Sequence, residues 1–595
     1  MSDELGARVS GKGTFFAVRA PLAEGVWLCL FEEGDERRIA MTRSDDVWHC
    51  RLAGDLSGAR YGYRAEGEWA PEHGRWFDPA KLLVDPYAFE IDRRFVYDSK
   101  LSDFGADTAD IVPRAIVPGK LPRIRKRKPC FERGGLIYEL NVKALTWLHP
   151  EVPEKLRGRV AALAHPAVIA HLKKLHVSAV ELMPVVAWID ERHLPPLGLH
   201  NAWGYNPVAP MALDPGLCPG GVAELRETVA ALHAEGIGTI LDIVLNHTGE
   251  SDIHGPVLSL RGLDDEAYAR EPNGELANVT GCGNTLDFGN EAVRELALAA
   301  LRHFVAHCGI DGFRFDLAPV LARGPEFDPH APFFAEISAD PLLADRVLIA
   351  EPWDIGPGGY RLGQFPANWL EWNDRYRDDV RRFWRGDGGA GTFATRIAGS
   401  ADVFGKANCR SVSFLAAHDG FTLADTVSYS IRHNWANGEG NRDGHGGEVC
   451  WNNAHEGPSD DLQVLARRAA DLRAMLGTLF ASTGTIMLTA GDEFGRSHRG
   501  NNNAYCQDNE LTWLDWDERD SALEEFVAGI AAARAATPKR WMSFPESGEW
   551  SSLDGSPMTV ADWENSATQG FEFSANGERI SIDRESRLAR RQVSG

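Results

Sequence analysis

The 595-residue sequence predicts an α/β fold: a (β/α)8 TIM barrel that follows an N-terminal β-sandwich and precedes a short C-terminal β-region. From Leu136 onward, apolar runs of strand length alternate with amphipathic helical stretches, which is the pattern of parallel βαβ units. Four of these runs end in Asp, Glu, His or Arg, and such a barrel carries its chemistry at the carboxyl ends of its strands. The sequence leaves open whether the C-terminal β-region is complete.

The composition indicates an acidic globular protein of two to four domains. A net charge of -24 argues against nucleic acid or an anionic membrane as partner, because phosphate binding needs a positive field, whereas a neutral polymer would be indifferent to it. The N-terminal residues lack the features of a secretory signal, and no apolar stretch approaches the roughly 18 to 20 residues of a membrane span. The nine cysteines include no Cys-x-x-Cys pair, which excludes a disulfide framework or a zinc site of that type. We expect a cytoplasmic protein, either a monomer or a small homo-oligomer.

Residues 1–115 predict the β-sandwich and residues 116–134 a linker. Pro118–Arg133 is basic, which indicates nucleic acid only weakly and favours a solvated connection. Strand-like runs separated by Gly-rich and charged turns carry the sandwich prediction: Gly13–Arg19, Val26–Phe31, Val47–Arg51 and Tyr61–Arg64.

Residues 135–538 predict the barrel, with a long excursion at 247–290 between the third and fourth strands. Eight strands are expected, the sixth of them weakly: Leu136–Leu140, Ala179–Met183, Thr239–Val244, Gly312–Asp316, Val347–Ala350, Asp402–Phe404, Val412–Leu415 and Thr485–Leu488. Apolar residues at helical spacing predict intervening helices, among them Ala223–His233, Glu291–His307 and a closing helix at Ser521–Ala536. Residues 539–595 hold two strand-like pieces, Phe571–Phe573 and Arg579–Asp583, and an Arg-rich polar tail at 584–591.

Three carboxylates at strand ends suggest the chemistry of a retaining glycosidase. Arg314 and Asp316 lie two residues apart on one strand face, so the guanidinium should keep Asp316 ionised, as a nucleophile requires. Glu351 follows an apolar run, and desolvation there would raise its pKa, which suits a general acid. His418 and Asp419 end a later strand, where they could grip sugar hydroxyls.

Each motif also has a structural interpretation. An Asp at a strand end is usually the N-cap of the next helix, and Arg314 with Asp316 could be a structural ion pair. For a single motif the structural interpretation is preferred. Four motifs in order, all at strand ends, favour a catalytic site.

The four segments resemble the signature regions of the α-amylase superfamily, glycoside hydrolase family 13, and more specifically those of the isoamylase-type bacterial glycogen debranching enzymes. The resemblance covers about residues 10–545. Beyond the strand ends it rests on Leu136–Lys143, Trp203–Pro207, Thr280–Thr285, Glu351–Asp354, Ala436–Gly444 and Gly500–Asp508. The N-terminal sandwich resembles the glycogen-binding-type module of such enzymes; its Trp27, Trp48 and Trp69 are sugar platforms or core, and core is favoured.

The resemblance implies roles for individual residues. Asp316 would be the nucleophile and Glu351 the acid/base, while Asp419 would stabilise the oxocarbenium-like state. Arg314, His247 and His418 would line the sugar subsite, Tyr205 would stack on the ring, and Trp353 would favour debranching. Asp242 and Asn246 would be structural. The matching Asn ligates calcium in some α-amylases, but the co-ligands cannot be identified here, so we expect no cofactor.

The expected reaction is hydrolysis of α-1,6 branch linkages in glycogen or limit dextrin by double displacement. The nearest alternative is an α-1,4-acting glucanotransferase or branching enzyme with the same carboxylates. A non-catalytic glucan-binding protein is a third interpretation, against which the three intact carboxylates argue. The excursion after His247 and the Gly- and Asn-rich loop Asn434–Asn453 are expected to shape a pocket for a branched chain.

Overall fold

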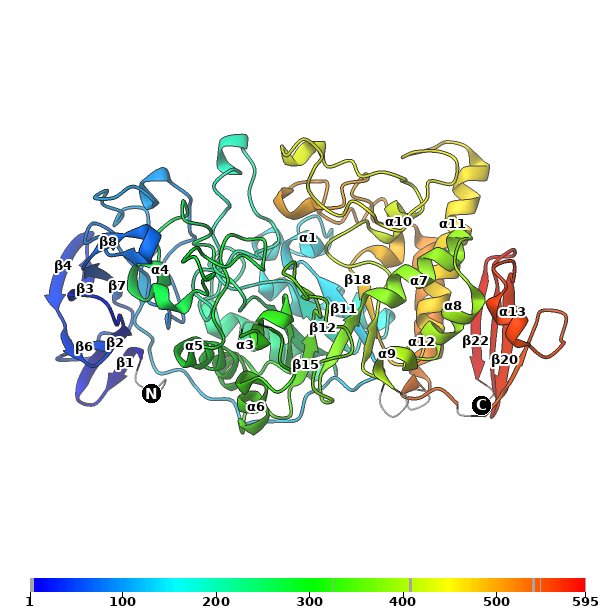
Figure 1. Cartoon of the computed structure of the whole chain (residues 1–595), viewed down its shortest axis with the longest axis horizontal. Coiled ribbons are helices and arrows are strands. Elements are labelled where there is room, and N and C mark those ends of the chain that lie inside the picture. Colours follow the sequence, from blue (N-terminus) through cyan, green and yellow to red (C-terminus); the bar gives the residue numbers. More distant parts are fainter. Residues whose placement is uncertain (1–4, 325, 406–408, 538–540, 546, 594–595) are drawn as a thin grey trace.

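The structure, a computed structural model, describes residues 5–324, 326–405, 409–537, 541–545 and 547–593. The N-terminal sandwich, the barrel and a C-terminal sheet follow one another along the long axis of the molecule (Figure 1). Among the described residues no helix combines the length and the apolar character needed to cross a membrane.

The N-terminal domain consists of two four-stranded antiparallel sheets. The first has the order β1 (Gly6–Ser10), β2 (Gly13–Arg19), β6 (Val47–Leu52), β5 (Thr42–Ser44), and the second the order β10 (Ala115–Ile116), β7 (Arg60–Glu66), β3 (Gly25–Glu32), β4 (Asp35–Ala40). A small hairpin, β8 (Trp69–Ala70) and β9 (Arg75–Trp76), follows β7. Of the three tryptophans left open by the sequence, Trp48 is a core residue, whereas Trp27 and Trp69 are half-buried.

The core of the sandwich continues into the barrel. Residues of the sandwich strands such as Phe16 and Leu28 belong to the same apolar cluster as Ile189 and Leu258 of the barrel loops. Backbone bonds support the junction, since Val84 N donates to the carbonyl of Leu258 at 2.8 Å. The sandwich core therefore extends into the loops of the barrel, while the barrel strands and helices form apolar clusters of their own.

The basic connection between the domains packs along the barrel. Ile124 N donates to the carbonyl of Ala306 at 2.7 Å, and Lys126 pairs with Asp345 at 3.0 Å. Figure 1 shows this segment running as an extended thread beneath the barrel helices. Its positive charges are thus partly used in attaching the connection to the barrel.

Eight parallel strands close the predicted barrel. In order they are β11 (Leu136–Leu140), β12 (Ala179–Leu182), β13 (Gly238–Ile243), β14 (Gly312–Phe315), β15 (Val347–Ala350), β16 (Leu370–Asn373), β17 (Ser411–Ser413) and β18 (Thr485–Thr489). The predicted positions are confirmed for seven strands. The sixth was wrong, because Ala401–Phe404 forms helix α9 and the sixth strand is β16.

The sequence did not indicate the sixth strand because this strand contains a charged residue that is buried in an ion pair. Glu371 interrupts the apolar character of β16, but its side chain is fully buried, accepting from Arg410 Nη1 at 2.7 Å and from Gly363 N at 2.6 Å. A charge is seldom buried unless it is paired, and here the partner lies 39 residues further along the chain. The sequence around β16 gives no indication of that pairing.

The barrel interior is layered. A lower apolar layer contains Ile137, Ala179, Ile240, Ile349 and Met487. Two residues further along the strands, the inward positions become charged, and the register pairs Glu139 with Glu181 and Asp242 with Arg314. The catalytic candidates lie above this charged layer, so the barrel supports them with a set of buried ionisable groups.

Helices surround the barrel. They include α2 (Pro166–Lys174), α3 (Gly221–Ala234), α5 (Glu291–His303), α6 (Pro332–Ala339), α7 (Asp374–Arg385), α8 (Ala390–Ile397), α11 (Leu462–Ala481) and α12 (Ser521–Ala535). The predicted helix Glu291–His307 stops being α-helical at His303 and ends in a single π-helical turn, Phe304–Cys308. Within the long excursion, short turns α4 (Leu260–Leu263) and η7 (Asp265–Ala267) pack near the sandwich.

The C-terminal region is a four-stranded antiparallel sheet, β19 (Glu549–Ser551), β20 (Gly570–Ala575), β21 (Glu578–Asp583) and β22 (Leu588–Val593). It packs on α11, and side chains such as Phe571 and Ile582 join the barrel core. The prediction of a polar tail at 584–591 was wrong. The arginines there are held in the fold, for example Arg587 by Asp471 at 2.8 Å and Arg591 by Glu578.

Candidate active site

An open cleft of about 1350 Å³ lies at the carboxyl ends of the barrel strands. Six of the eight predicted site residues line it: Tyr205, His247, Asp316, Glu351, His418 and Asp419. Arg314 lies in the charged layer below, and Trp353 packs against the apolar layer of the barrel instead of lining the cleft. The strand ends thus bring the three carboxylates into one cavity.

Asp316 is held as a hydrogen-bond acceptor. The amide of Asn246 donates to its Oδ2 and to its backbone carbonyl, each at 2.8 Å, and Arg314 Nη1 lies 3.2 Å from Oδ1. Each oxygen of its carboxyl group thus faces a donor group, one an amide and the other a guanidinium. The side chain is 12% exposed and therefore still reaches the cleft.

The surroundings of Glu351 raise the pKa of its carboxyl group. Burial raises its pKa to about 8, and the nearby carboxylate of Asp316 adds to the shift, while Arg314 opposes it. One oxygen, Oε2, accepts from Leu317 N at 2.7 Å and lies 3.2 Å from Arg314 Nη2. Leu317 has a positive φ of 40°, an unfavourable conformation for this residue that directs its N–H at Glu351. The raised pKa favours the protonated form of Glu351 beside the carboxyl group of Asp316.

Arg314 connects these groups from below. Its side chain is fully buried, donates from Nη1 to Asp242 at 2.9 Å, and lies 4.2 Å from the ring of Trp372. Asp242 also accepts from the hydroxyl of Tyr205, and burial raises its pKa to about 6. The predicted structural role of Asp242 agrees with these contacts, since its oxygens are used inside the protein.

Tyr205 and His418 form one stacked wall of the cleft. Their ring centroids lie 4.8 Å apart at an interplanar angle of 27°. Glu139, in the charged layer, accepts from His418 Nδ1 at 2.7 Å; although burial opposes it, this carboxylate raises the pKa of His418 to about 9. His247 Nε2 donates to the backbone carbonyl of Tyr205 at 2.9 Å, and this hydrogen bond also holds Tyr205 in place.

Asp419 has a partner that the sequence did not suggest. His445 Nε2 lies 2.9 Å from Asp419 Oδ2, and both residues line the cleft. Burial alone would raise the pKa of Asp419, but the hydrogen bond from His445 and the charge of His418 hold it well below its usual value. His445 lies on the loop Asn434–Asn453, where neither periodicity nor a recognisable motif marks it.

An amide network holds this loop in place. Asn434 and Asn502 exchange two hydrogen bonds of 2.9 Å, and Asn502 Nδ2 donates to the carbonyl of His445 at 2.9 Å. Asn501 Nδ2 donates a single hydrogen bond to Asn437 Oδ1 at 2.9 Å. The Asn-rich segment Gly500–Asp508 therefore fixes the position of His445 beside Asp419.

The sandwich also reaches the cleft. Pro71, Glu72 and His73, in the turn between β8 and β9, line it together with the excursion residues Arg270 and Asn273. This contribution was not predicted, because the sequence does not reveal how the two domains are oriented. The cleft is thus a product of both domains.

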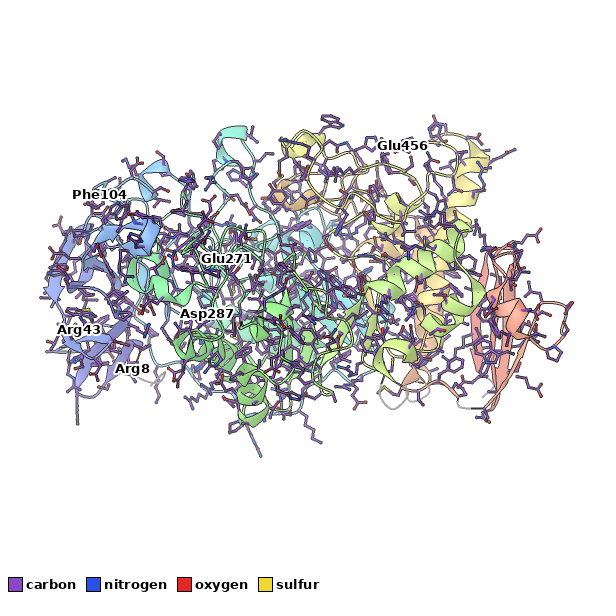
Figure 2. All side chains as sticks on the ribbon, viewed as in Figure 1. Arg8, Arg43, Phe104, Glu271, Asp287 and Glu456 are labelled. Carbon is purple, nitrogen blue, oxygen red and sulfur yellow. The ribbon has the colours of Figure 1, made fainter. Side chains whose placement is uncertain are left out.

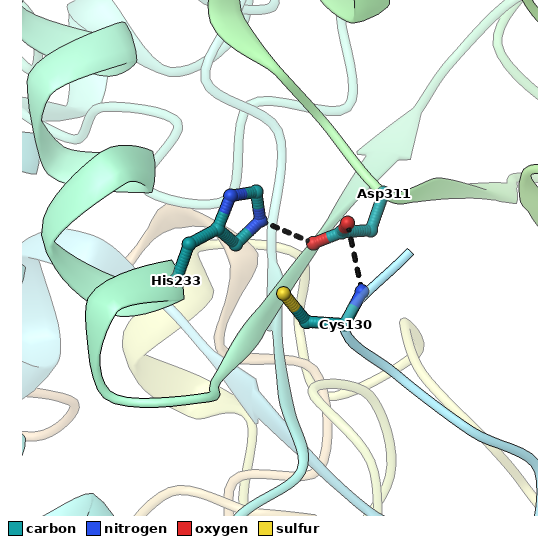
Figure 3. Close-up of side chains that lie close together, drawn as sticks. All are labelled: Cys130, His233 and Asp311. Carbon is teal, nitrogen blue, oxygen red and sulfur yellow. Dashed lines mark hydrogen bonds and ion pairs between the residues drawn. The ribbon is translucent and has the colours of Figure 1, made fainter. Parts of the chain in front are cut away.

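Among the described residues, one group of three potential metal ligands is found, and it lies at the opposite ends of the strands. His233 and Cys130 approach Asp311, which precedes β14 (Figure 3). Asp311 already accepts from His233 Nε2 at 2.6 Å, Thr239 N at 2.8 Å and Cys130 N at 3.1 Å. Both carboxylate oxygens of Asp311 accept hydrogen bonds from the protein. Asp311 therefore links α3 and β13 to the segment that connects the sandwich with the barrel.

A closed parallel barrel that places three carboxylates and a buried arginine at one open cleft is an arrangement suited to glycoside hydrolysis. The fold and the site thus define the chain as a glycoside hydrolase. Comparisons with known proteins narrow the assignment.

A family model described as carbohydrate-binding module 48, the isoamylase N-terminal domain, matches residues 4–88. The glycogen debranching enzyme of Klebsiella pneumoniae is 46% identical over 586 residues, which cover 95% of this chain and 89% of that protein. The glycogen debranching enzyme of Pectobacterium carotovorum is 45% identical, again over 95% of this chain and 89% of that protein. The chain belongs to the family of bacterial glycogen debranching enzymes.

Solved structures agree with the fold. A pullulanase from an Anoxybacillus species complexed with maltotetraose has a TM-score of 0.67 at 23% identity, covering 97% of this chain and 78% of that one. A pullulanase from Paenibacillus barengoltzii, in complex with maltohexaose and alpha-cyclodextrin, has a TM-score of 0.67 at 22% identity, covering 90% and 81%.

Proposed function

We propose that this protein hydrolyses the α-1,6 branch linkages of glycogen or limit dextrin in the cytoplasm, with retention of the anomeric configuration. One observation carries the assignment of roles. Arg314 contacts both Asp316 and Glu351 at 3.2 Å, while burial keeps Glu351 protonated and Asn246 donates to Asp316. Two neighbouring carboxyl groups in opposite protonation states form the acid and nucleophile pair of a double displacement.

In the first step, Asp316 attacks the anomeric carbon of the branch, and the bond from that carbon to the O6 oxygen breaks. Glu351 gives its proton to O6, so the main chain leaves with a neutral C6 hydroxyl. Positive charge develops on the sugar ring, and the ionised Asp316 and Asp419 stabilise it. The product is a glycosyl ester on Asp316.

In the second step, a water molecule replaces the main chain. Glu351, now ionised, takes a proton from the water, whose oxygen attacks the same carbon and releases Asp316. The branch leaves as a linear oligosaccharide with a free reducing end. Two inversions at one carbon give net retention.

Asp316, Glu351 and a water molecule supply the reacting groups of both proposed steps, and Asn246 contacts one of them. Asn246, whose counterpart ligates calcium in some α-amylases, donates its amide to Asp316, and its Oδ1 contacts His247 Nδ1. Both polar atoms of its side chain are thus engaged within the site. We therefore propose that Asn246 orients Asp316.

The loops around the cleft favour a branched substrate. The loop carrying His445 and the excursion residues Arg270–Cys282 line an open cavity with room for both a branch and the chain that bears it. We expect release of short linear α-1,4 chains from glycogen and limit dextrin, with little attack on unbranched amylose. Shortening of amylose as fast as glycogen is debranched would instead support an α-1,4-acting enzyme.

A further inference from the structure

We propose a zinc-binding site, formed by Cys130, His233 and Asp311, at the end of the barrel opposite the cleft. The three residues come from separate segments: the connection between the domains, the last turn of helix α3 and the position before β14. One ligand atom from each residue lies within 4.8 Å of the other two. A thiolate, an imidazole and a carboxylate are ligands that zinc takes in proteins, and a water molecule can supply the fourth.

Asp311 is held in place by backbone donors that a metal ion would not displace. Cys130 N donates to Oδ1 at 3.1 Å, and Thr239 N donates to Oδ2 at 2.8 Å. Gly238 allows this close approach, because a Cβ there would lie 3.2 Å from Oδ2 of Asp311 and 3.1 Å from the backbone nitrogen of Phe131. Carboxylates that bind metal ions are usually oriented by additional hydrogen bonds of this kind.

Cys130 and His233 supply the other two ligand atoms. Figure 3 shows the sulfur of Cys130 beside the contact between His233 Nε2 and Asp311 Oδ2, which are 2.6 Å apart. Within the described ranges no hydrogen bond to this thiol is found, so the sulfur can bind a metal ion without losing a partner. With bonds of about 2.0–2.3 Å, a tetrahedral zinc ion holds its ligand atoms roughly 3.3–3.6 Å apart, so shifts of about 1 Å would complete the site.

Zinc would take the place of the hydrogen atom between His233 and Asp311. His233 would bind through Nε2 and keep its ring proton on Nδ1, while Asp311 would bind through Oδ2. The thiol of Cys130 would give its proton to solvent as the zinc–sulfur bond forms. Nothing is oxidised or reduced in this step.

Cysteine, histidine and aspartate also occur together in nucleophilic sites. A nucleophilic cysteine needs a thiol pKa below its usual value. Here burial and the charge of Asp311 raise the pKa of Cys130. The group is therefore better suited to binding a metal ion than to covalent catalysis.

A zinc ion in this position would attach the connection to the barrel. Asp311 lies 181 residues from Cys130 and 78 residues from His233 in the sequence. The three ligand atoms come together only in the folded chain, so the ion should stabilise the folded state.

The proposed site is remote from the cleft. The connection runs beneath the barrel in Figure 1, whereas Glu456, which accepts from Asn452 in the loop that carries His445, lies at the upper edge of the molecule in Figure 2. The direction of β14 gives the same separation, because Asp311 precedes this strand and Asp316 follows it. Zinc bound here should therefore stabilise the fold without contacting the cleft.

The test is titration of Zn²⁺ into enzyme freed of metal with a chelator, followed by calorimetry and by thermal melts. We expect one tightly bound zinc ion per chain. At a free zinc concentration about 100 times Kd, Tm should rise by about 2 °C. Co²⁺ in place of zinc should give the near-ultraviolet charge-transfer band of a cobalt–thiolate bond.

Cys130→Ser should abolish this band and weaken zinc binding by at least about tenfold. His233→Gln should weaken zinc binding in the same way. Its amide can still donate to Asp311, so it serves as the second variant if Cys130→Ser lowers the Tm of the metal-free enzyme.

Cys50→Ser is the matched control, because Cys50 is also a half-buried free thiol but lies on β6 of the sandwich. It should bind zinc as the wild-type enzyme does. Absence of a stoichiometric zinc ion in the wild-type enzyme would overturn the proposal. Zinc binding of unchanged affinity in both Cys130→Ser and His233→Gln would overturn it as well.

Discussion

Nε2 of His445 lies 2.9 Å from Oδ2 of Asp419, so a loop residue outside the four strand-end motifs contacts the third carboxylate of the cleft. In the described part of the chain no hydrogen bond to Oδ1 of Asp419 is found, and under the proposed function this oxygen would accept from a sugar hydroxyl. The hydrogen bond raises the pKa of His445, which favours the imidazolium. His445 thus orients Asp419 and keeps it ionised.

We therefore expect His445→Ala to lower kcat/KM on limit dextrin by roughly 10- to 100-fold, since a hydrogen bond to a charged group contributes about 1.5–3 kcal/mol. His445→Gln should lose less, because its amide can still donate. His455→Ala is a suitable control, since that side chain is exposed and bonds to the carbonyl of Pro458. Activity of His445→Ala within about twofold of wild type would show that Asp419 is positioned without it.

Asp316→Asn should remove nearly all turnover, by more than about 10³-fold or ~4 kcal/mol, because an amide cannot form the glycosyl ester. The shape of the side chain is kept, so Tm should change little. Asp287→Asn, at a residue that does not line the cleft and whose carbonyl oxygen would still accept from Gly289 N, controls for the substitution. Residual activity within about tenfold of wild type would mean that another group is the nucleophile.

The pH dependence of kcat/KM should reflect Glu351. Burial raises its pKa to about 8, and the reaction begins with the protonated acid, so activity should fall as pH rises through this value. Glu351→Gln should lose far more activity on limit dextrin than on an activated aryl glucoside, whose leaving group needs no proton. A profile that stays flat above pH 9, or equal losses on the two substrates, would contradict the assignment.

Arg410→Met should destabilise the fold by about 3–5 kcal/mol, because it leaves Glu371 buried without its partner. Burial already raises the pKa of Glu371 to about 7. A raised carboxyl pKa means that stability is lost as pH rises through it, so the variant should be weaker at pH 8 than at pH 5.5. Glu371→Gln combined with Arg410→Met should recover part of the loss in thermal melts, and no recovery would argue against this origin.

The sequence predicted the parts of the site that lie at strand ends. Asp316, Glu351 and Asp419 each follow a buried apolar run, and the barrel topology alone brings such positions together. It could not predict His445, because the position of a loop residue depends on tertiary contacts such as those of Asn434 and Asn502. Local patterns contain no information about such contacts.

The same limit explains the errors in the fold. Strand β16 is short and carries Glu371, whose burial depends on a distant arginine. The Arg-rich segment near the C-terminus looks solvated in sequence but forms β22, because Asp471 and Glu578 neutralise its arginines. In both cases the local sequence suggests a solvated segment, whereas an ion pair with a residue elsewhere in the chain allows the segment to form a strand.

The apolar cluster that joins the sandwich to the barrel bears on how the molecule unfolds. Val84 and Leu258 belong to it from opposite sides of the junction and are joined by a backbone hydrogen bond, so opening the junction would expose both to water. The sandwich should therefore not swing as a hinged appendage, and heating should melt it in one calorimetric transition with the barrel. Severed from the barrel, it would expose the apolar face that now covers Leu258 and would tend to aggregate.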